Sequence, residues 1–270
     1  MLKISVLDVG HGDFIYVVTP FGDNLVIDCG SGTIVPSVFL AKITSITELQ
    51  ISHLHTDHFD DILNLSSKTI LSFRCPDIDF HSDTSIGWKK NDLDKLNRIK
   101  YLKNNIGADG TVVQTGNGFS YDVWRPGNAT AENPNSASFV TVLSYNGFKM
   151  LFGGDLPDAG WINLLANSDF CKLISGTDII KVPHHGRKEG CSPSLFNHIS
   201  PKLSIISDKS LDKDNVNTCC TQWYTQRSRG CNVIGFTQQA KVLTTRTNGS
   251  IHIQVEPNGN WKVYPGTSWV

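Results

Sequence analysis

The chain has 270 residues, 39% of them hydrophobic and 18% charged, and this length and composition can bury a sizeable core. Its 24 lysines and arginines nearly balance 25 aspartates and glutamates, so no overall basic field indicates a nucleic-acid partner. No apolar stretch is long enough to span a bilayer, and the seven cysteines include no CxxC pair, which together predict a cytoplasmic protein with reduced thiols and no membrane partner.

Short β-rich runs separated by glycine and proline open the chain. They predict strands at residues 2–9, 14–19 and 24–28. A helix at 37–42 follows, and then a strand at 49–52 that leads directly into a group of histidines. Further along, apolar residues recur at three-residue steps among polar ones, which predicts an amphipathic helix at 88–105.

The second half of the chain repeats this alternation of strands and helices. Strands are predicted at 111–114, 138–145, 149–152, 178–183, 203–207, 233–236, 240–245 and 250–256, and helices at 160–166 and 217–229. No low-complexity linker or proline-rich hinge divides the sequence. We therefore expect residues 1–270 to form one domain, with two sheets covered by a few helices.

Four candidate metal ligands stand within the segment HLHTDH, namely His53, His55, Asp57 and His58. Imidazole and carboxylate groups suit zinc, manganese and iron. Because side chains alternate along an extended segment, His53 and His55 can face the same ion. Asp57 and His58 are adjacent, and from a turn they can face a second ion. A surface loop that is rich in histidine by chance is the alternative interpretation.

HLHTDH resembles the HxHxDH signature of the metallo-β-lactamase superfamily. LDVGHGDFIYV at 7–17, LFGGDL at 151–156 and KVPHHG at 181–186 resemble, in this order, the nuclease-like domain of the DNA-uptake protein ComEC. VLTTRTNGSIHI at 242–253 resembles the closing hairpin of that family. The resemblance covers most of the chain and implies an α+β fold, a four-layer αββα sandwich with two divalent metal ions at one edge.

The resemblance implies that Asp155 is the carboxylate shared by the two ions. Asp155 follows two glycines that let the backbone approach closely, although Pro157 also allows it to cap a following helix. One histidine of the pair at 184 and 185 is then the last ligand. We expect His185, with His184 facing the substrate, and the reverse assignment stays open. The predicted ligand set is His53, His55, Asp57, His58, Asp155 and His185.

Most members of the superfamily supply a third histidine to the first ion. His81 is the only histidine in the corresponding interval, and its polar surroundings favour a surface position. At the expected place stands NPNS at 133–136, which resembles a ComEC-like pattern and makes Asn135 and Ser136 candidates for the site. An amide oxygen is a poor zinc ligand but is acceptable to manganese or magnesium. We therefore expect two divalent ions, Zn²⁺ or Mn²⁺, and the choice between them stays open.

Other polar residues near these motifs are candidates for substrate contacts or for support of the ligands. Asp8, His11 and Asp13 lie in a glycine-rich turn, where they can approach the metals or only satisfy backbone donors. Asp28 matches an aspartate that usually orients a ligating histidine. Lys181 can stabilise negative charge on a phosphate, or it can extend from the edge of a strand.

These residues predict a hydrolase that uses a metal-bridging hydroxide, with Asp57, His184 and Lys181 as catalytic side chains. A phosphodiester suits two cations that clamp the attacking and leaving oxygens, so we expect a phosphodiesterase acting on a nucleic acid or a small nucleotide. The alternatives are a hydrolase of small esters, lactones or thioesters, and a subunit of a multi-component system that depends on a protein partner.

Overall fold

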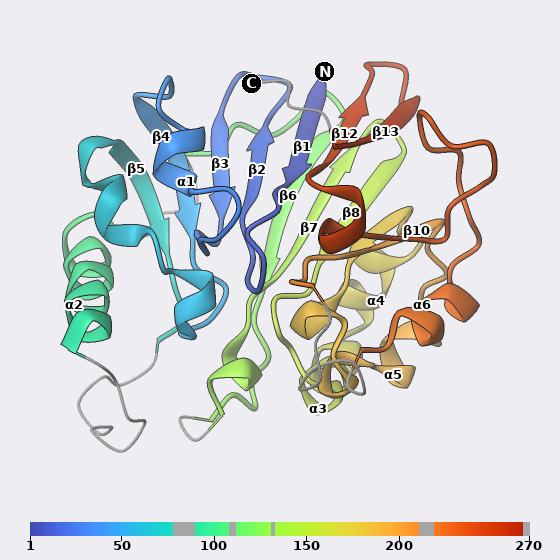
Figure 1. The fold of residues 1–270 in the computed structure, drawn as a ribbon. Helices are drawn as coiled ribbons and strands as arrows, with labels where there is room; N and C mark the ends of the chain where they lie inside the picture. Colours follow the sequence, from blue (N-terminus) through green and yellow to red (C-terminus); the bar gives the residue numbers. More distant parts are fainter. Residues whose placement is uncertain (78–89, 108–111, 131–132, 211–218, 267–270) are drawn as a thin grey trace.

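Two β-sheets lie face to face at the centre of the molecule (Figure 1). The structure is a computed structural model and describes residues 1–77, 90–107, 112–130, 133–210 and 219–266. The first sheet contains β1 (Leu2–Val6), β2 (Ile15–Val18), β3 (Asn24–Ile27), β4 (Ser45–Gln50), β5 (Thr69–Arg74), β12 (Ile251–Val255) and β13 (Trp261–Pro265). Its order is β13-β12-β1-β2-β3-β4-β5, and β3, β4 and β5 run parallel.

The second sheet has the order β11-β10-β9-β8-β7-β6. Its strands are β6 (Phe119–Trp124), β7 (Val140–Tyr145), β8 (Phe148–Phe152), β9 (Ile179–Lys181), β10 (Leu203–Ile206) and β11 (Val242–Thr244). Strands β8 to β11 run parallel to one another. Parallel strands end at the same edge, so loops that are distant in sequence are brought together there.

Helices cover the outer face of each sheet (Figure 1). The first sheet packs against α1 (Pro36–Phe39) and α2 (Lys90–Asn105), and the second against α3 (Asp158–Leu165), α4 (Ser168–Ile174), α5 (Pro193–Phe196) and α6 (Thr221–Arg227). A further short helix, α7 (Thr245–Asn248), follows β11. The predicted four-layer αββα architecture is confirmed. No helix among the described residues combines the length and apolar character needed to cross a bilayer.

Side chains of the inner strands alternate between two hydrophobic clusters. In β2, Ile15 and Val17 face the core between the sheets, whereas Tyr16 faces the helices outside. In β8, Met150 faces the inner core and Leu151 the outer helices. Successive side chains of a strand point to opposite faces of its sheet. Because both faces of these sheets are covered, apolar residues are required on both.

Two predicted strands are wrong. The described residues 112–114 and 233–236 form no strand; Val113 and Val233 instead insert from loops into the core between the sheets. Strands β5, β6 and β13 were not predicted. They lie at the edges of the sheets, where polar and half-exposed side chains interrupt the apolar pattern.

Candidate metal centre

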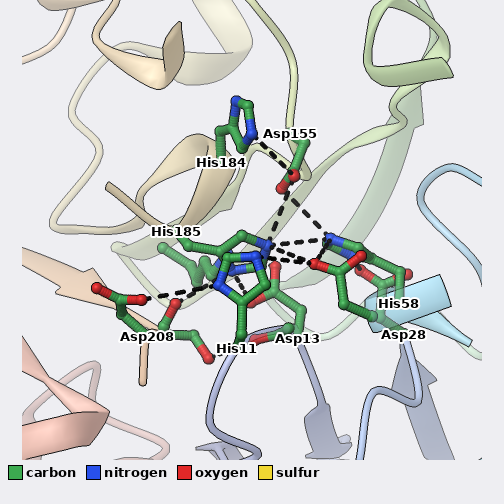
Figure 2. Close-up of polar contacts among 12 residues, drawn as sticks. His11, Asp13, Asp28, His58, Asp155, His184, His185 and Asp208 are labelled. Atoms are coloured by element: carbon green, nitrogen blue, oxygen red, sulfur yellow. Dashed lines mark hydrogen bonds and ion pairs between the residues drawn. The ribbon is translucent and has the colours of Figure 1, made fainter. Parts of the chain in front are cut away.

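All the predicted ligands follow the carboxyl ends of strands at one edge of the two sheets. His53, His55, Asp57 and His58 follow β4; Asp155 follows β8; and the pair at 184 and 185 follows β9. Figure 2 shows several of these side chains converging, although they come from three separate segments of the chain. The fold therefore assembles one polar cluster from the three motifs.

The first group that could hold a metal ion consists of His53, His55 and Asp155. His53 Nε2 lies 3.1 Å from His55 Nδ1 and 3.8 Å from Asp155 Oδ2. His53 is fully buried, and burial lowers its pKa well below the usual value. The ring is therefore neutral, the form in which imidazole binds a metal.

The second group consists of His58, Asp155 and His185. His58 Nε2 lies 3.3 Å from His185 Nε2 and 3.4 Å from Asp155 Oδ1. Asp57 Oδ2 lies 3.2 Å from His185 Nε2 and 3.8 Å from His58 Nε2, so it borders the same group. Asp155 belongs to both groups, with Oδ1 near His58 and Oδ2 near His53.

The charges of this cluster fit bound cations. Burial opposes the charged form of His185, yet the carboxylate of Asp155 and other nearby acidic groups raise its pKa to about 10. His58 behaves in the same way: burial opposes its charge, but Asp155, Asp28 and Asp57 raise its pKa well above the usual range. Several buried carboxylates therefore strongly favour positive charge at this point, and divalent ions would supply it.

Asp155 Oδ1 and Asn135 Oδ1 are among the buried side-chain oxygens that have no hydrogen bond within the described residues. Asn135 lies beside the first group, because its side chain interacts with His55. Buried polar atoms are normally paired, so both oxygens are suited to a ligand such as a metal ion.

Asp28 orients His58 from behind. Its Oδ2 lies 2.8 Å from His58 Nδ1, and it also accepts hydrogen bonds from the backbone and hydroxyl of Ser52 at 2.6 and 2.8 Å. With Nδ1 engaged, Nε2 of His58 faces the cluster. Asp28 is buried and has a φ of 60°, a left-handed conformation that costs energy and is often retained at functional sites.

His185 is oriented by a backbone carbonyl. Its Nδ1 lies 3.1 Å from the carbonyl oxygen of Ser207, and 3.7 Å from Asp13 Oδ1. The ammonium group of Lys181 pairs with the other oxygen of Asp13, and both side chains are only 1% exposed. Lys181 therefore lies beneath the cluster and supports Asp13 instead of reaching the surface on which a substrate would lie.

The turn that carries His184 and His185 is strained. Both residues have left-handed backbones, with φ values of 50° and 49°. His185 is fully buried in the cluster, whereas the His184 side chain is 24% exposed, with Nε2 3.9 Å from Asp155 Oδ2. The groups that could hold a metal contain His185 and not His184. The assignment of His185 as the ligand stays a prediction that this geometry favours.

His11 lies at the open side of the cluster. Its Nε2 is 3.4 Å from Asp57 Oδ2, and its ring packs against His185 with centroids 4.5 Å apart. On its other side, Nδ1 lies 3.8 Å from Asp208 Oδ1 (Figure 2). Its side chain is 41% exposed, so His11 is accessible from solvent.

Two other candidate residues, Asp8 and Ser136, make hydrogen bonds within their own loops. Asp8 accepts a hydrogen bond from the backbone of Gly10, as a turn residue does. Ser136 donates to the carbonyl of Asn133 and accepts from the backbone of Thr130, so it shapes the loop beside Asn135. His81 lies outside the described residues.

Sequence reasoning missed Ser52, Ser207 and Asp208. Ser52 directly precedes the histidine motif, and Asp208 follows the strand β10 much as Asp28 follows β3. An aspartate at the end of a buried apolar strand was a signal that could have identified Asp208. Ser207 contacts His185 through its backbone carbonyl, so the identity of its side chain gives no signal in the sequence.

Three of the solved structures that are similar to this chain illustrate the match. The metallo-β-lactamase fold protein YhfI from Bacillus subtilis has a TM-score of 0.52 and 12% identity, over 93% of this chain and 99% of that one. CmlA, a diiron β-hydroxylase from Streptomyces venezuelae, has a TM-score of 0.49 and 14% identity, over 79% of this chain and 48% of its own. The short form of human tRNase Z has a TM-score of 0.43 and 15% identity, over 78% of this chain and 96% of its own.

The similarity to the B. subtilis protein, together with the two sheets and their outer helices, shows the metallo-β-lactamase fold. No family model matches the sequence, and no curated protein is significantly similar to it.

Proposed function

We propose that this chain, which has the metallo-β-lactamase fold, is a metal-dependent hydrolase that cleaves phosphodiesters. The observation that carries the proposal is Asp155, whose two oxygens face two neighbouring groups of imidazoles. One ion would be held by His53, His55 and Asp155, and a second by His58, Asp155 and His185 with Asp57 beside them. The Asn135 oxygen is suited to complete the first site, where an amide ligand favours Mn²⁺ over Zn²⁺.

When bound, two divalent ions supply Lewis-acid polarisation of a phosphoryl oxygen and a source of hydroxide near neutral pH. The protein holds the ligands still: Asp28 fixes the ring of His58, and the Ser207 carbonyl fixes the ring of His185. The partly exposed His184 is placed to hydrogen-bond a substrate oxygen near Asp155. Lys181 acts indirectly, by holding Asp13 next to His185.

The same geometry supports a phosphodiester as the proposed substrate. Two cation sites that share a carboxylate suit an in-line displacement at phosphorus, where both the attacking and the leaving oxygen carry negative charge. The ComEC-like segments at 7–17, 151–156 and 181–186 support a nucleic acid or a nucleotide as that substrate.

The test is hydrolysis of bis-p-nitrophenyl phosphate by protein stripped of metal and then reloaded with Mn²⁺ or Zn²⁺. We expect turnover only after reloading. In His55→Ala and Asp155→Asn, kcat/KM should fall at least about 100-fold, because each substitution removes a ligand and not merely its support. The matched control is His198→Ala, since His198 is an exposed histidine that belongs to none of the groups that could hold a metal, and it should keep full activity.

Other outcomes would redirect the assignment. Metal uptake with hydrolysis of p-nitrophenyl acetate or a thioester, but not of the diester, would indicate a small-molecule ester hydrolase. Metal uptake without hydrolysis of any of these compounds would favour a subunit that requires a protein partner. Cleavage of linear DNA in parallel with the diester would favour a nuclease.

A further inference from the structure

His11 reaches the candidate metal centre from the loop between β1 and β2, outside the three motifs that carry the assigned ligands (Figure 2). Its Nε2 lies 3.4 Å from Asp57 Oδ2, and that oxygen lies 3.2 Å from His185 Nε2. His11, Asp57 and His185 form a further group that could hold a metal ion. Neither ion of the proposed function uses His11, so its place in this group requires an explanation.

The distances in this group are those of ligand atoms that share one ion. Atoms bound about 2.1 Å from a metal lie about 3.0–3.4 Å apart when they are neighbours in its shell. The contacts of Asp57 Oδ2 with His11 and His185 fall in this range, as does the 3.3 Å between Nε2 of His58 and Nε2 of His185. Nδ1 of His185 faces the carbonyl of Ser207, which leaves Nε2 for an ion. Since one nitrogen binds one ion, His11 would share the ion of His58 and His185.

Backbone contacts fix the loop that carries His11. The hydroxyl of Ser207 donates to the carbonyl of Gly12 at 2.7 Å, and the backbone N–H of Asp13 donates to the carbonyl of Asp57 at 3.3 Å. A Cβ atom on Gly12 would lie 2.3 Å from that carbonyl oxygen of Asp57, so a glycine is needed for this close approach. The loop therefore holds His11 beside Asp57, although the side chain of His11 is exposed to solvent.

A buried carboxylate faces the opposite nitrogen of His11. His11 Nδ1 lies 3.8 Å from Oδ1 of Asp208, a side chain that two guanidinium groups hold at 3.2 and 2.9 Å. Asp28 faces Nδ1 of His58 from the corresponding side, and the two aspartates follow the strands β10 and β3. Ligating histidines usually have such a partner on the nitrogen that does not bind the metal. Asp208 is thus placed to orient His11.

We propose that Nε2 of His11 is a further ligand of the second ion, beside Asp57 and the three residues of the second group. The inference rests on the metal centre of the proposed function and deepens it, because it makes the two ions unequal. The second ion would have three imidazole ligands, whereas the first would have two imidazoles and the amide of Asn135. Imidazole suits zinc and similar transition metals better than a carbonyl oxygen does. The second site should therefore fill first, and activity should follow the concentration of free metal that fills the first site.

The test is a Co²⁺ titration of the metal-stripped protein, followed by visible absorption and by competition with a chelator. We expect a tight step and a weaker step. His11→Phe keeps a ring against His185 but removes both nitrogens. It should weaken the tight step at least about tenfold and change the absorption of the tightly bound Co²⁺, because that ion loses a ligand.

Other variants separate the two steps. His55→Ala removes a ligand of the first group and should weaken only the weaker step. In His11→Ala, added imidazole should restore the absorption of the tightly bound ion, since the vacated position is open to solvent. His198→Ala, at an exposed histidine outside the groups that could hold a metal, is the matched control and should leave both steps unchanged.

The outcomes distinguish this ligand from the proposed function. A tight step and an absorption spectrum that His11→Phe leaves unchanged would show that the ring only packs against His185, and would overturn the inference. Two steps of equal affinity in the unchanged protein would overturn the inequality of the ions. A tight step that depends on His11, with no diester cleaved by any metal-loaded form, would retain the ligand and remove the proposed function.

Discussion

Each histidine of the second metal group is held through the ring nitrogen that faces away from the cluster. Asp28 holds His58, and a backbone carbonyl holds His185. Such contacts fix the tautomer and the direction of the free nitrogen. The side chain of Asp28 also ties down Ser52, which precedes the histidine motif, so one carboxylate positions both the ring and the loop that carries it.

Replacing Asp28 with alanine should therefore weaken metal binding. We expect the Kd for Mn²⁺ to rise roughly 10- to 100-fold, as measured by competition with a chelator. Asp178→Ala is the matched control, because Asp178 is also buried and accepts a backbone hydrogen bond, but it directly precedes β9, at the end of that strand opposite the metal centre. Unchanged metal affinity in Asp28→Ala would contradict the supporting role.

At this scale the sequence indicates the candidate ligands more readily than the residues that support them. His53, His55 and His58 form a compact motif, and Asp155 and His185 stand in recognisable segments. The neighbours of Lys181 in the sequence do not reveal that it is buried. They allow a phosphate-binding residue or a residue at the edge of a strand. The burial of Lys181 depends on Asp13, which is 168 residues away in the chain.

At the scale of elements, the loops after the strands pack so closely that side-chain volume is excluded. A Cβ atom on Gly30, just after β3, would lie 2.1 Å from the carbonyl oxygen of Asp57 and 3.0 Å from that of Asp13. Both nearest atoms are backbone atoms, so they cannot move aside cheaply. Gly30 thus lets the loop after β3 pack directly against the turn that carries Asp57 and His58.

Gly30→Ala should displace that turn. We expect a loss of about 1–3 kcal/mol in the free energy of unfolding, as overpacking costs, together with weaker Mn²⁺ binding. Chemical denaturation and metal titration measure the two effects. Gly127→Ala serves as the control, since its Cβ would have 3.7 Å to its nearest neighbour. A Gly30→Ala protein with normal stability and normal metal affinity would refute the close packing.

The elements that could be predicted from sequence are those covered on both faces. β1, β2, β3, β7, β8 and β10 are short apolar runs bounded by turn residues, and all were predicted. The edge strands β5, β6 and β13 escape this reasoning because each pairs with a single neighbour and its half-exposed side chains interrupt the apolar pattern, whereas the edge strand β11 was predicted at 240–245. Val113 and Val233 show the opposite error, since a loop residue can fill a core without belonging to a strand.

At the scale of the whole molecule, the first and last parts of the described chain are adjacent in one sheet. β1 pairs with β2 on one side and with β12 on the other. Ser5 and His252 lie opposite each other in this pairing, and their side chains are hydrogen-bonded at 2.8 Å. Burial lowers the pKa of His252 to about 4.

This histidine should make the fold sensitive to acid. In the unfolded chain His252 binds a proton near its usual pKa of 6.5, whereas in the fold it does so only near 4. Between these values the unfolded chain binds more protons, so stability falls as the pH falls. From pH 7.5 to pH 5 we expect His252 to account for a loss of about 2 kcal/mol.

The comparison is urea denaturation of the metal-free protein and of His252→Gln at both pH values. The variant should lose about 2 kcal/mol less than the unchanged protein across this interval. His198→Gln, at an exposed histidine, should lose as much as the unchanged protein does. Equal losses in all three proteins would show that His252 does not carry the acid sensitivity.

The pairing of β1 with β12 also governs how the protein can fold during its synthesis. Ser5 and His252 are 247 residues apart, a distance that a ribosome covers in about 10–50 s at roughly 5–20 residues per second. Throughout that time one edge of β1 lacks its native partner, and every strand of the second sheet emerges before β12 does. We expect the nascent chain to depend on chaperones that shield this apolar strand, and the metal centre to be completed only after translation has delivered β12.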